Sequence, residues 1–101
     1  MPLDLFSPYG TTTAVSVSGT TASGTLTVPT APMTSSVRIY NSAVVVCFIK
    51  FGVSGITATT SDMPIAPGGV ETFEIGPGVT TIAGITGGTS GTLYATPGRG
   101  A

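Results

Sequence analysis

Clusters of glycine and proline divide this chain into short segments, and this division most constrains its fold. The 101 residues include 15 Gly and 8 Pro, which interrupt helices and favour turns. Between these clusters the chain is rich in Val, Ile and Thr, which suit the pleated, half-buried surface of a β-sheet. No segment has an apolar period of 3.6 residues, and helix-forming residues are scarce. The sequence therefore predicts an all-β protein.

The predicted strands alternate apolar and polar residues with a period of two. Their expected ranges are residues 11–18, 25–28, 37–41, 44–51, 70–75, 79–85 and 92–96, with a weaker segment at 56–60 and turns at 19–24 and 63–69. Seven to eight short strands at spacings of about ten residues are typical of an antiparallel β-sandwich or a jelly-roll-like barrel. We expect an irregular N-terminal arm at residues 1–10, one β-sandwich domain at 11–97 and a frayed tail at 98–101.

Ionisable side chains are few, which argues against an enzyme. There is no His, and the charged residues are Asp4, Arg38, Lys50, Asp62, Glu71, Glu74 and Arg99. Catalysis depends on such groups to move protons, hold metals or stabilise developing charge. Glu71 and Glu74 are three positions apart on a predicted strand, so they should face opposite sides and share no acid–base role. We expect no catalytic residue, no cofactor and no metal site.

The charge pattern also limits the partners. The net charge is −1 and the three cations are scattered, which argues against binding to nucleic acid or to an anionic membrane surface. The start of the chain does not have the pattern of a secretory signal, and no apolar run approaches the length of about 18 residues that a membrane span needs. We expect a soluble protein made in the cytoplasm, and its near-zero net charge favours assembly.

The single cysteine, Cys47, excludes an intrachain disulfide. It lies within an apolar run and has no neighbouring group that would activate it. A free cysteine in such a run usually behaves as a small buried apolar side chain rather than as a nucleophile.

The run at residues 44–51 is apolar on both faces, unlike the other predicted strands. One face would carry Val45, Cys47, Ile49 and Phe51, and the other would carry Val44, Val46, Phe48 and Lys50. Either the strand lies in the middle of a thick core, or another chain covers the outer face of its sheet. Burial of Val44, Val46 and Phe48 would each contribute about 1.5–3 kcal/mol.

The N-terminal arm is also apolar, through Leu3, Leu5 and Phe6. These side chains need a surface to pack on, which belongs either to the same domain or to a neighbouring subunit. The residues that we expect at an interface are Leu3, Leu5, Phe6, Tyr40, Val44, Val46 and Phe48.

Three segments carry a resemblance to a known family. They are Ser36-Val-Arg-Ile-Tyr-Asn-Ser, Val45-Val-Cys-Phe-Ile-Lys-Phe-Gly and Ala58-Thr-Thr-Ser-Asp-Met-Pro-Ile-Ala-Pro-Gly-Gly-Val-Glu-Thr-Phe. In pattern and layout, residues 36–97 resemble the small head-decoration, or cement, proteins of tailed bacteriophages. The resemblance implies a structural protein on the capsid surface of the virion, which binds the major capsid protein and forms homo-oligomers, often trimers. Residues 1–35 are not covered by it.

Two other functions stay open. The chain could be a carbohydrate- or receptor-binding module of a phage tail or fibre, with Tyr9, Tyr40 and Tyr94 as the aromatic residues, although the absence of Trp argues against this. It could also be a head-to-tail connector protein. A structural capsid protein fits best with an apolar arm, a strand that is apolar on both faces and a lack of catalytic groups.

Overall fold

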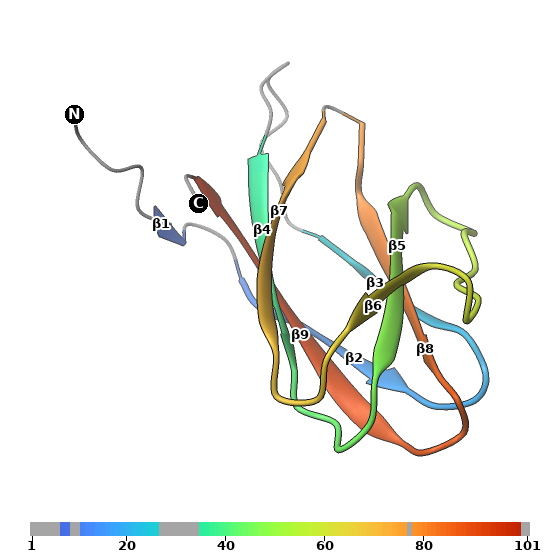
Figure 1. Ribbon diagram of the computed structural model, residues 1–101. Coiled ribbons are helices and arrows are strands. Elements are labelled where there is room, and N and C mark those ends of the chain that lie inside the picture. Colours follow the sequence, from blue (N-terminus) through green and yellow to red (C-terminus); the bar gives the residue numbers. More distant parts are fainter. Residues whose placement is uncertain (1–6, 9–10, 27–34, 77, 100–101) are drawn as a thin grey trace.

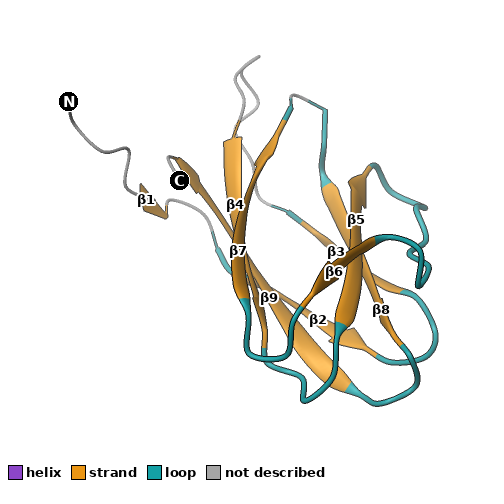
Figure 2. Cartoon of the chain, in the orientation of Figure 1, coloured by secondary structure: helices purple, strands orange, loops and turns teal. Residues whose placement is uncertain are grey.

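The chain folds as a β-sandwich. The computed structural model describes residues 7–8, 11–26, 35–76 and 78–99. In these ranges the regular secondary structure consists of β-strands alone. The strands form two antiparallel sheets packed face to face (Figures 1 and 2). The prediction of an all-β antiparallel sandwich of short strands is confirmed.

One sheet has five strands. They are β1 (Ser7–Pro8), β2 (Thr13–Val17), β4 (Ser35–Asn41), β7 (Val70–Ile75) and β9 (Gly91–Arg99). β4 lies between β7 and β9, while β2 and β1 share the other edge of β9. β9 extends two residues beyond the predicted end of the domain, and there it pairs with β1.

The other sheet has four strands in the order β3-β8-β5-β6. They are β3 (Ala22–Thr25), β8 (Thr81–Thr86), β5 (Cys47–Gly52) and β6 (Met63–Ile65). The edge strand β6 is only three residues long and contains Pro64. Both features protect a sheet edge from pairing with another strand.

The core lies between the sheets and is filled by alternate residues of the strands. The largest fully buried apolar side chains are Val15, Val17, Val37, Ile39, Ile49, Ile65, Ile82 and Leu93. Because side chains alternate across a strand, their neighbours in sequence point to the outer faces. Glu71 pairs with the inward Ile39, whereas Glu74 pairs with Ser36 on the outer face, so the two carboxylates do face opposite sides.

Four predicted elements differ from the structure. The strand expected at residues 44–51 begins only at Cys47, because residues 43–45 bend sharply. Residues 22–25, expected mostly as a turn, form β3, and residues 63–65 form β6. Residues 56–60 contain no strand. β3 and β6 are short edge strands held by pairing with β8 and β5, a tertiary contact that local sequence does not reveal.

The loop at residues 53–62 covers part of the outer face of the four-stranded sheet. The side chain of Ile56 packs on the outer side of Gly52, and the Ala58 amide donates a hydrogen bond of 2.8 Å to Thr21 Oγ1, just before β3. Since β8 lies between β5 and β3, the loop crosses over β8. The outward side chains Thr81 and Ala83 are accordingly buried.

We expect Gly91→Ala to destabilise the fold. A Cβ atom at Gly91 would overlap the Cβ of Ala43 and lie 2.9 Å from its Cα. Overpacking of this kind costs about 1–3 kcal/mol in the free energy of unfolding, which urea denaturation would measure. Gly87→Ala is the matched control, because nothing lies within 4 Å of a Cβ there. Equal stability of the two variants would contradict the close approach of β9 to Ala43.

Candidate interaction surfaces

The residues expected at an interface do not form one surface. Leu3, Leu5 and Phe6 lie outside the described residues. The other four are Tyr40, Val44, Val46 and Phe48, and they lie in three places: the outer face of the five-stranded sheet, one end of the sandwich, and the outer face of the four-stranded sheet.

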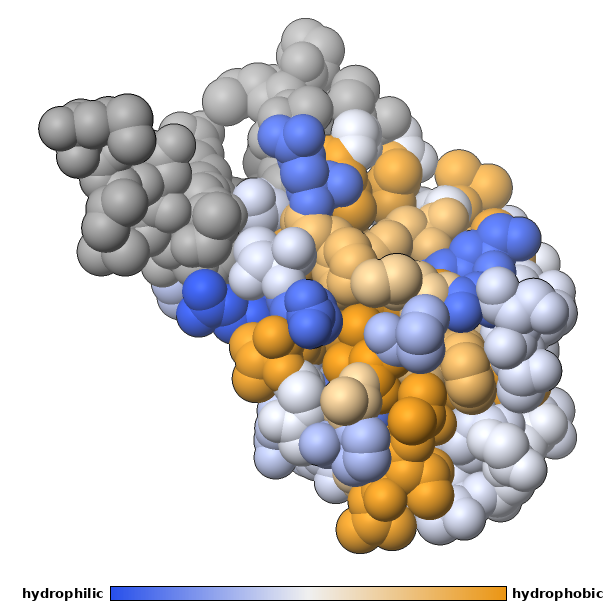
Figure 3. Space-filling model, in the orientation of Figure 1, coloured by the Kyte–Doolittle hydropathy of each residue, from blue (hydrophilic) through white to orange (hydrophobic). Residues whose placement is uncertain are grey.

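The end loop, residues 42–46, connects β4 to β5 at one end of the sandwich (Figure 1). Val44 is 79% exposed and Val46 is 38% exposed. In Figure 3, orange apolar atoms lie at the bottom of the view, where Figure 1 places this loop. The end loop therefore presents aliphatic side chains to solvent where polar residues would be expected.

The buried amide of Asn41 holds the end loop in place. Its Nδ2 donates hydrogen bonds to the carbonyl oxygens of Val45 (3.0 Å), Ile65 (3.0 Å) and Ala66 (3.2 Å), and its Oδ1 accepts one from the Ala43 amide (2.9 Å). Two hydrogens serve three acceptors, so one bond is shared. The Asn41 side chain is fully buried, and its bonds join β4 to the end loop and to β6.

Phe48 belongs to β5, whereas Val44 and Val46 precede this strand in the end loop, so the prediction that one strand carries all three residues is wrong. Phe48 is half-buried on the outer face of the four-stranded sheet, paired with Ile85 of β8 and Pro64 of β6. The bend at residues 43–45 takes Val44 out of the strand, and Val46 lies between this bend and the first residue of β5. The inner face of β5 lies in the core, through Cys47 and Ile49.

Tyr40 and Tyr94 form an aromatic pair on the outer face of the five-stranded sheet. They are opposite one another on β4 and β9. Their ring centroids are 6.1 Å apart, the rings are 15° from parallel, and the side chains are 42% and 39% exposed. The sequence indicated each tyrosine as a candidate binding residue but did not show that the two are neighbours. Tyr9 lies outside the described residues.

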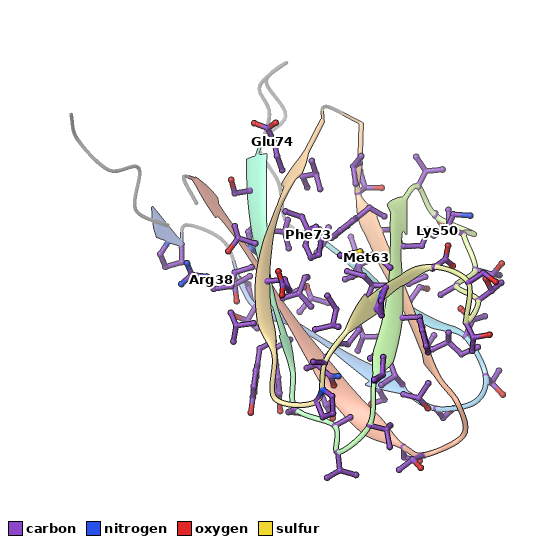
Figure 4. The ribbon with its side chains drawn as sticks, viewed as in Figure 1. Arg38, Lys50, Met63, Phe73 and Glu74 are labelled. Carbon is purple, nitrogen blue, oxygen red and sulfur yellow. The ribbon has the colours of Figure 1, made fainter. Side chains whose placement is uncertain are left out.

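The sequence did not indicate a further apolar area, at the open edge of the sandwich between β6 and β7. Met63 of β6 is 50% exposed there and Phe73 of β7 is half-buried; both side chains are labelled in Figure 4. Phe73 contacts Phe51 of the opposite sheet, with ring centroids 5.5 Å apart. This contact closes the core only partly, because both rings remain half-buried.

The charged side chains are dispersed. Arg38 and Lys50 lie on opposite outer faces of the sandwich (Figure 4), and Arg38 Nε donates to Thr72 Oγ1 at 3.3 Å. Within the described ranges, no three His, Cys, Asp or Glu residues are grouped so that they could hold a metal ion. The same ranges contain no helix that could cross a membrane.

Burial raises the pKa of the Cys47 thiol above its ordinary value, although backbone contacts with Ile85 and Phe48 partly oppose the rise. Cys47 is fully buried between the sheets. A thiol with a raised pKa carries little thiolate near neutral pH and is a poor nucleophile. The interpretation of Cys47 as a buried apolar residue agrees with this environment.

We expect the pKa of Cys47 to make stability depend on pH. The unfolded chain loses the thiol proton first as pH rises, so the free energy of unfolding should fall as the pH passes the ordinary pKa of a thiol. Urea denaturation at about pH 8 and about pH 10 would measure the fall. Cys47→Ala is the control and should lose less stability between these values; equal losses would contradict the prediction.

We also expect Asn41→Ala to lower the free energy of unfolding by about 3 kcal/mol, because it leaves buried backbone groups without partners. Urea denaturation would measure the loss. Ser42→Ala is the neighbouring control: Ser42 is exposed, and its hydroxyl donates a hydrogen bond to the Thr92 carbonyl oxygen at 2.7 Å. We expect that control to lose about 1 kcal/mol or less. Similar losses of unfolding free energy in the two variants would mean that the Asn41 side chain does not hold the end loop to β4 and β6.

Comparison of the chain with protein-family models, with curated proteins and with solved structures finds no match.

Proposed function

We propose that this chain is a structural virion protein that decorates and stabilises a bacteriophage head, and that its end loop binds the capsid. The observation that carries the proposal is the 79% exposure of Val44 in this loop. The resemblance of residues 36–97 to head-decoration proteins and the scarcity of ionisable groups support the same function.

The end loop is suited to docking because its backbone is already ordered. The Asn41 amide bonds to Val45 and Ala43, and Ser42 donates from its backbone amide to the Thr92 carbonyl oxygen at 3.0 Å. A loop that is fixed before binding loses little conformational entropy on docking. The surface area of Val44 and Val46 can then contribute to attachment.

One end loop alone would bind weakly. Full burial of a valine contributes about 1.5–3 kcal/mol, so the two partly exposed valines supply at most about 4 kcal/mol. A micromolar complex needs about 8 kcal/mol. Attachment therefore requires several copies that act together, because linked copies gain affinity through effective concentration. This requirement is consistent with a homo-oligomer, such as a trimer, that binds several copies of the major capsid protein.

We expect Val44→Asp to abolish attachment to the capsid while the sandwich stays folded. An aspartate in the end loop would place a charge against an apolar partner surface, and its desolvation is costly. Co-sedimentation with shells assembled from a major capsid protein of the same genome would measure attachment. Circular dichroism would check the β-structure, and light scattering would give the oligomeric state.

Val53→Asp is the matched control. Val53 is 58% exposed and follows β5, whereas the end loop precedes it, so the two valines are at opposite ends of the strand. The control should attach normally. The proposal fails if neither the parent chain nor an oligomer binds such shells, or if both aspartate variants bind equally well. A gene neighbourhood with no capsid gene would also count against it.

A further inference from the structure

A single row of exposed side chains crosses the outer face of the five-stranded sheet. Ala14 on β2 is opposite Tyr94 on β9, Tyr94 is opposite Tyr40 on β4, and Tyr40 is opposite Val70 on β7. All four residues are exposed. With strands about 4.8 Å apart, the row is about 14 Å long. We call these four residues the tyrosine row.

Hydroxyl-bearing residues flank the tyrosine row on both sides. Their members are Ser16, Ser42 and Thr92 on one side and Thr12, Thr72 and Thr96 on the other. Arg38 lies in the second group, between Thr96 and Thr72. The flanking residues on these strands include no carboxylate; Glu74 is one row further along β7, opposite Ser36. The face therefore combines an aromatic centre with polar, largely uncharged borders.

The two outer faces of the sandwich differ. The loop at residues 53–62 crosses β8 on the four-stranded sheet and buries Ala83. On the five-stranded sheet, the middle strands keep Tyr40 and Tyr94 42% and 39% exposed. An exposed pair of large aromatic side chains in the middle of a sheet is available for contact with a ligand.

The area of the tyrosine row suits a small ligand better than a second protein. At about 200 Å² for a tyrosine side chain, the exposed fractions of Tyr40 and Tyr94 leave about 160 Å² of aromatic surface, to which the smaller side chains of Val70 and Ala14 add. A standard protein interface buries about 800 Å² on each partner and has an apolar centre. On the five-stranded sheet the apolar strip is only one outward residue wide along each strand, and, apart from Arg38, the next outward residues on either side carry hydroxyl groups.

We propose that the tyrosine row binds an oligosaccharide. The face of a pyranose ring carries C–H groups that pack on the negative face of an aromatic ring. The hydroxyl groups around its rim require donors and acceptors, which the flanking serine and threonine hydroxyls supply. The arrangement thus matches a ligand that is apolar on its faces and polar at its rim.

A printed array of oligosaccharides made from neutral hexoses, N-acetylhexosamines and uronic acids would identify the sugar. Affinity can then be measured by intrinsic tyrosine emission, because the chain has three Tyr and no Trp. We expect Tyr40→Ala and Tyr94→Ala each to weaken binding about tenfold. Tyr40→Phe keeps the ring and should retain most of the affinity. Amide shifts in nuclear magnetic resonance should cluster on β4 and β9.

Val44→Asp and Val53→Asp are the controls, since both change exposed residues outside the row and should bind the sugar normally. Circular dichroism would show that the alanine variants are folded. The proposal is overturned if no sugar on the array binds, if binding survives both alanine substitutions, or if the shifts cluster on the four-stranded sheet or its loop at residues 53–62. A dimer that forms through the two tyrosines would overturn it too, because a second copy would then occupy the row.

Discussion

The buried amide of Asn41 joins the two sheets at one end of the sandwich. Its backbone belongs to β4, and its side chain bonds to carbonyl oxygens of Ile65 in β6, Ala66 just beyond β6 and Val45 in the end loop. The Asn41 backbone also accepts from the Gly68 amide and donates to the Gly69 carbonyl oxygen. Burying a polar group is costly unless the group is hydrogen-bonded. The Asn41 side chain makes all of its hydrogen bonds only when β4, β6 and the end loop are in their folded positions. The position of the end loop, and with it the exposure of Val44, depends on this one side chain.

The two outer faces follow from how the chain connects its strands. β5 and β6 are neighbours, yet the loop between them is ten residues long and passes over β8 before it returns. This path covers part of the outer face of the four-stranded sheet, so β8, one of its two inner strands, is largely buried on both faces. The strands of the five-stranded sheet remain half-exposed on the outside, through Tyr40, Tyr94 and Val70. Binding to other molecules is therefore more readily explained on the five-stranded sheet and at the end loop.

The fold class could be predicted from sequence because period-two patterns and turn residues are local signals. β7 was placed correctly on this basis, and β2, β4 and β8 nearly so. The bend at residues 43–45 could not be predicted, because it depends on the Asn41 amide and on a distant partner in β6. The same reason explains β3, whose Gly24 and Ser23 are poor strand formers but pair with Ile82 and Ala83 of β8. The tyrosine pair also depends on register, since Tyr40 and Tyr94 are far apart in sequence and meet only where β4 and β9 align.

The scarcity of charge sets the kind of interaction that these surfaces can make. With seven charged side chains in 101 residues, the protein has little long-range field to steer a partner, so binding must come from short-range contact and hydrogen bonds. Such contacts are insensitive to salt but need a close geometric match. A rigid sandwich provides that match, because its loop and strand positions are fixed by buried bonds and close packing. The end loop closes one end of the sandwich and the tyrosine row crosses its five-stranded face, and the two surfaces adjoin at Ser42, which belongs to the loop and flanks the row.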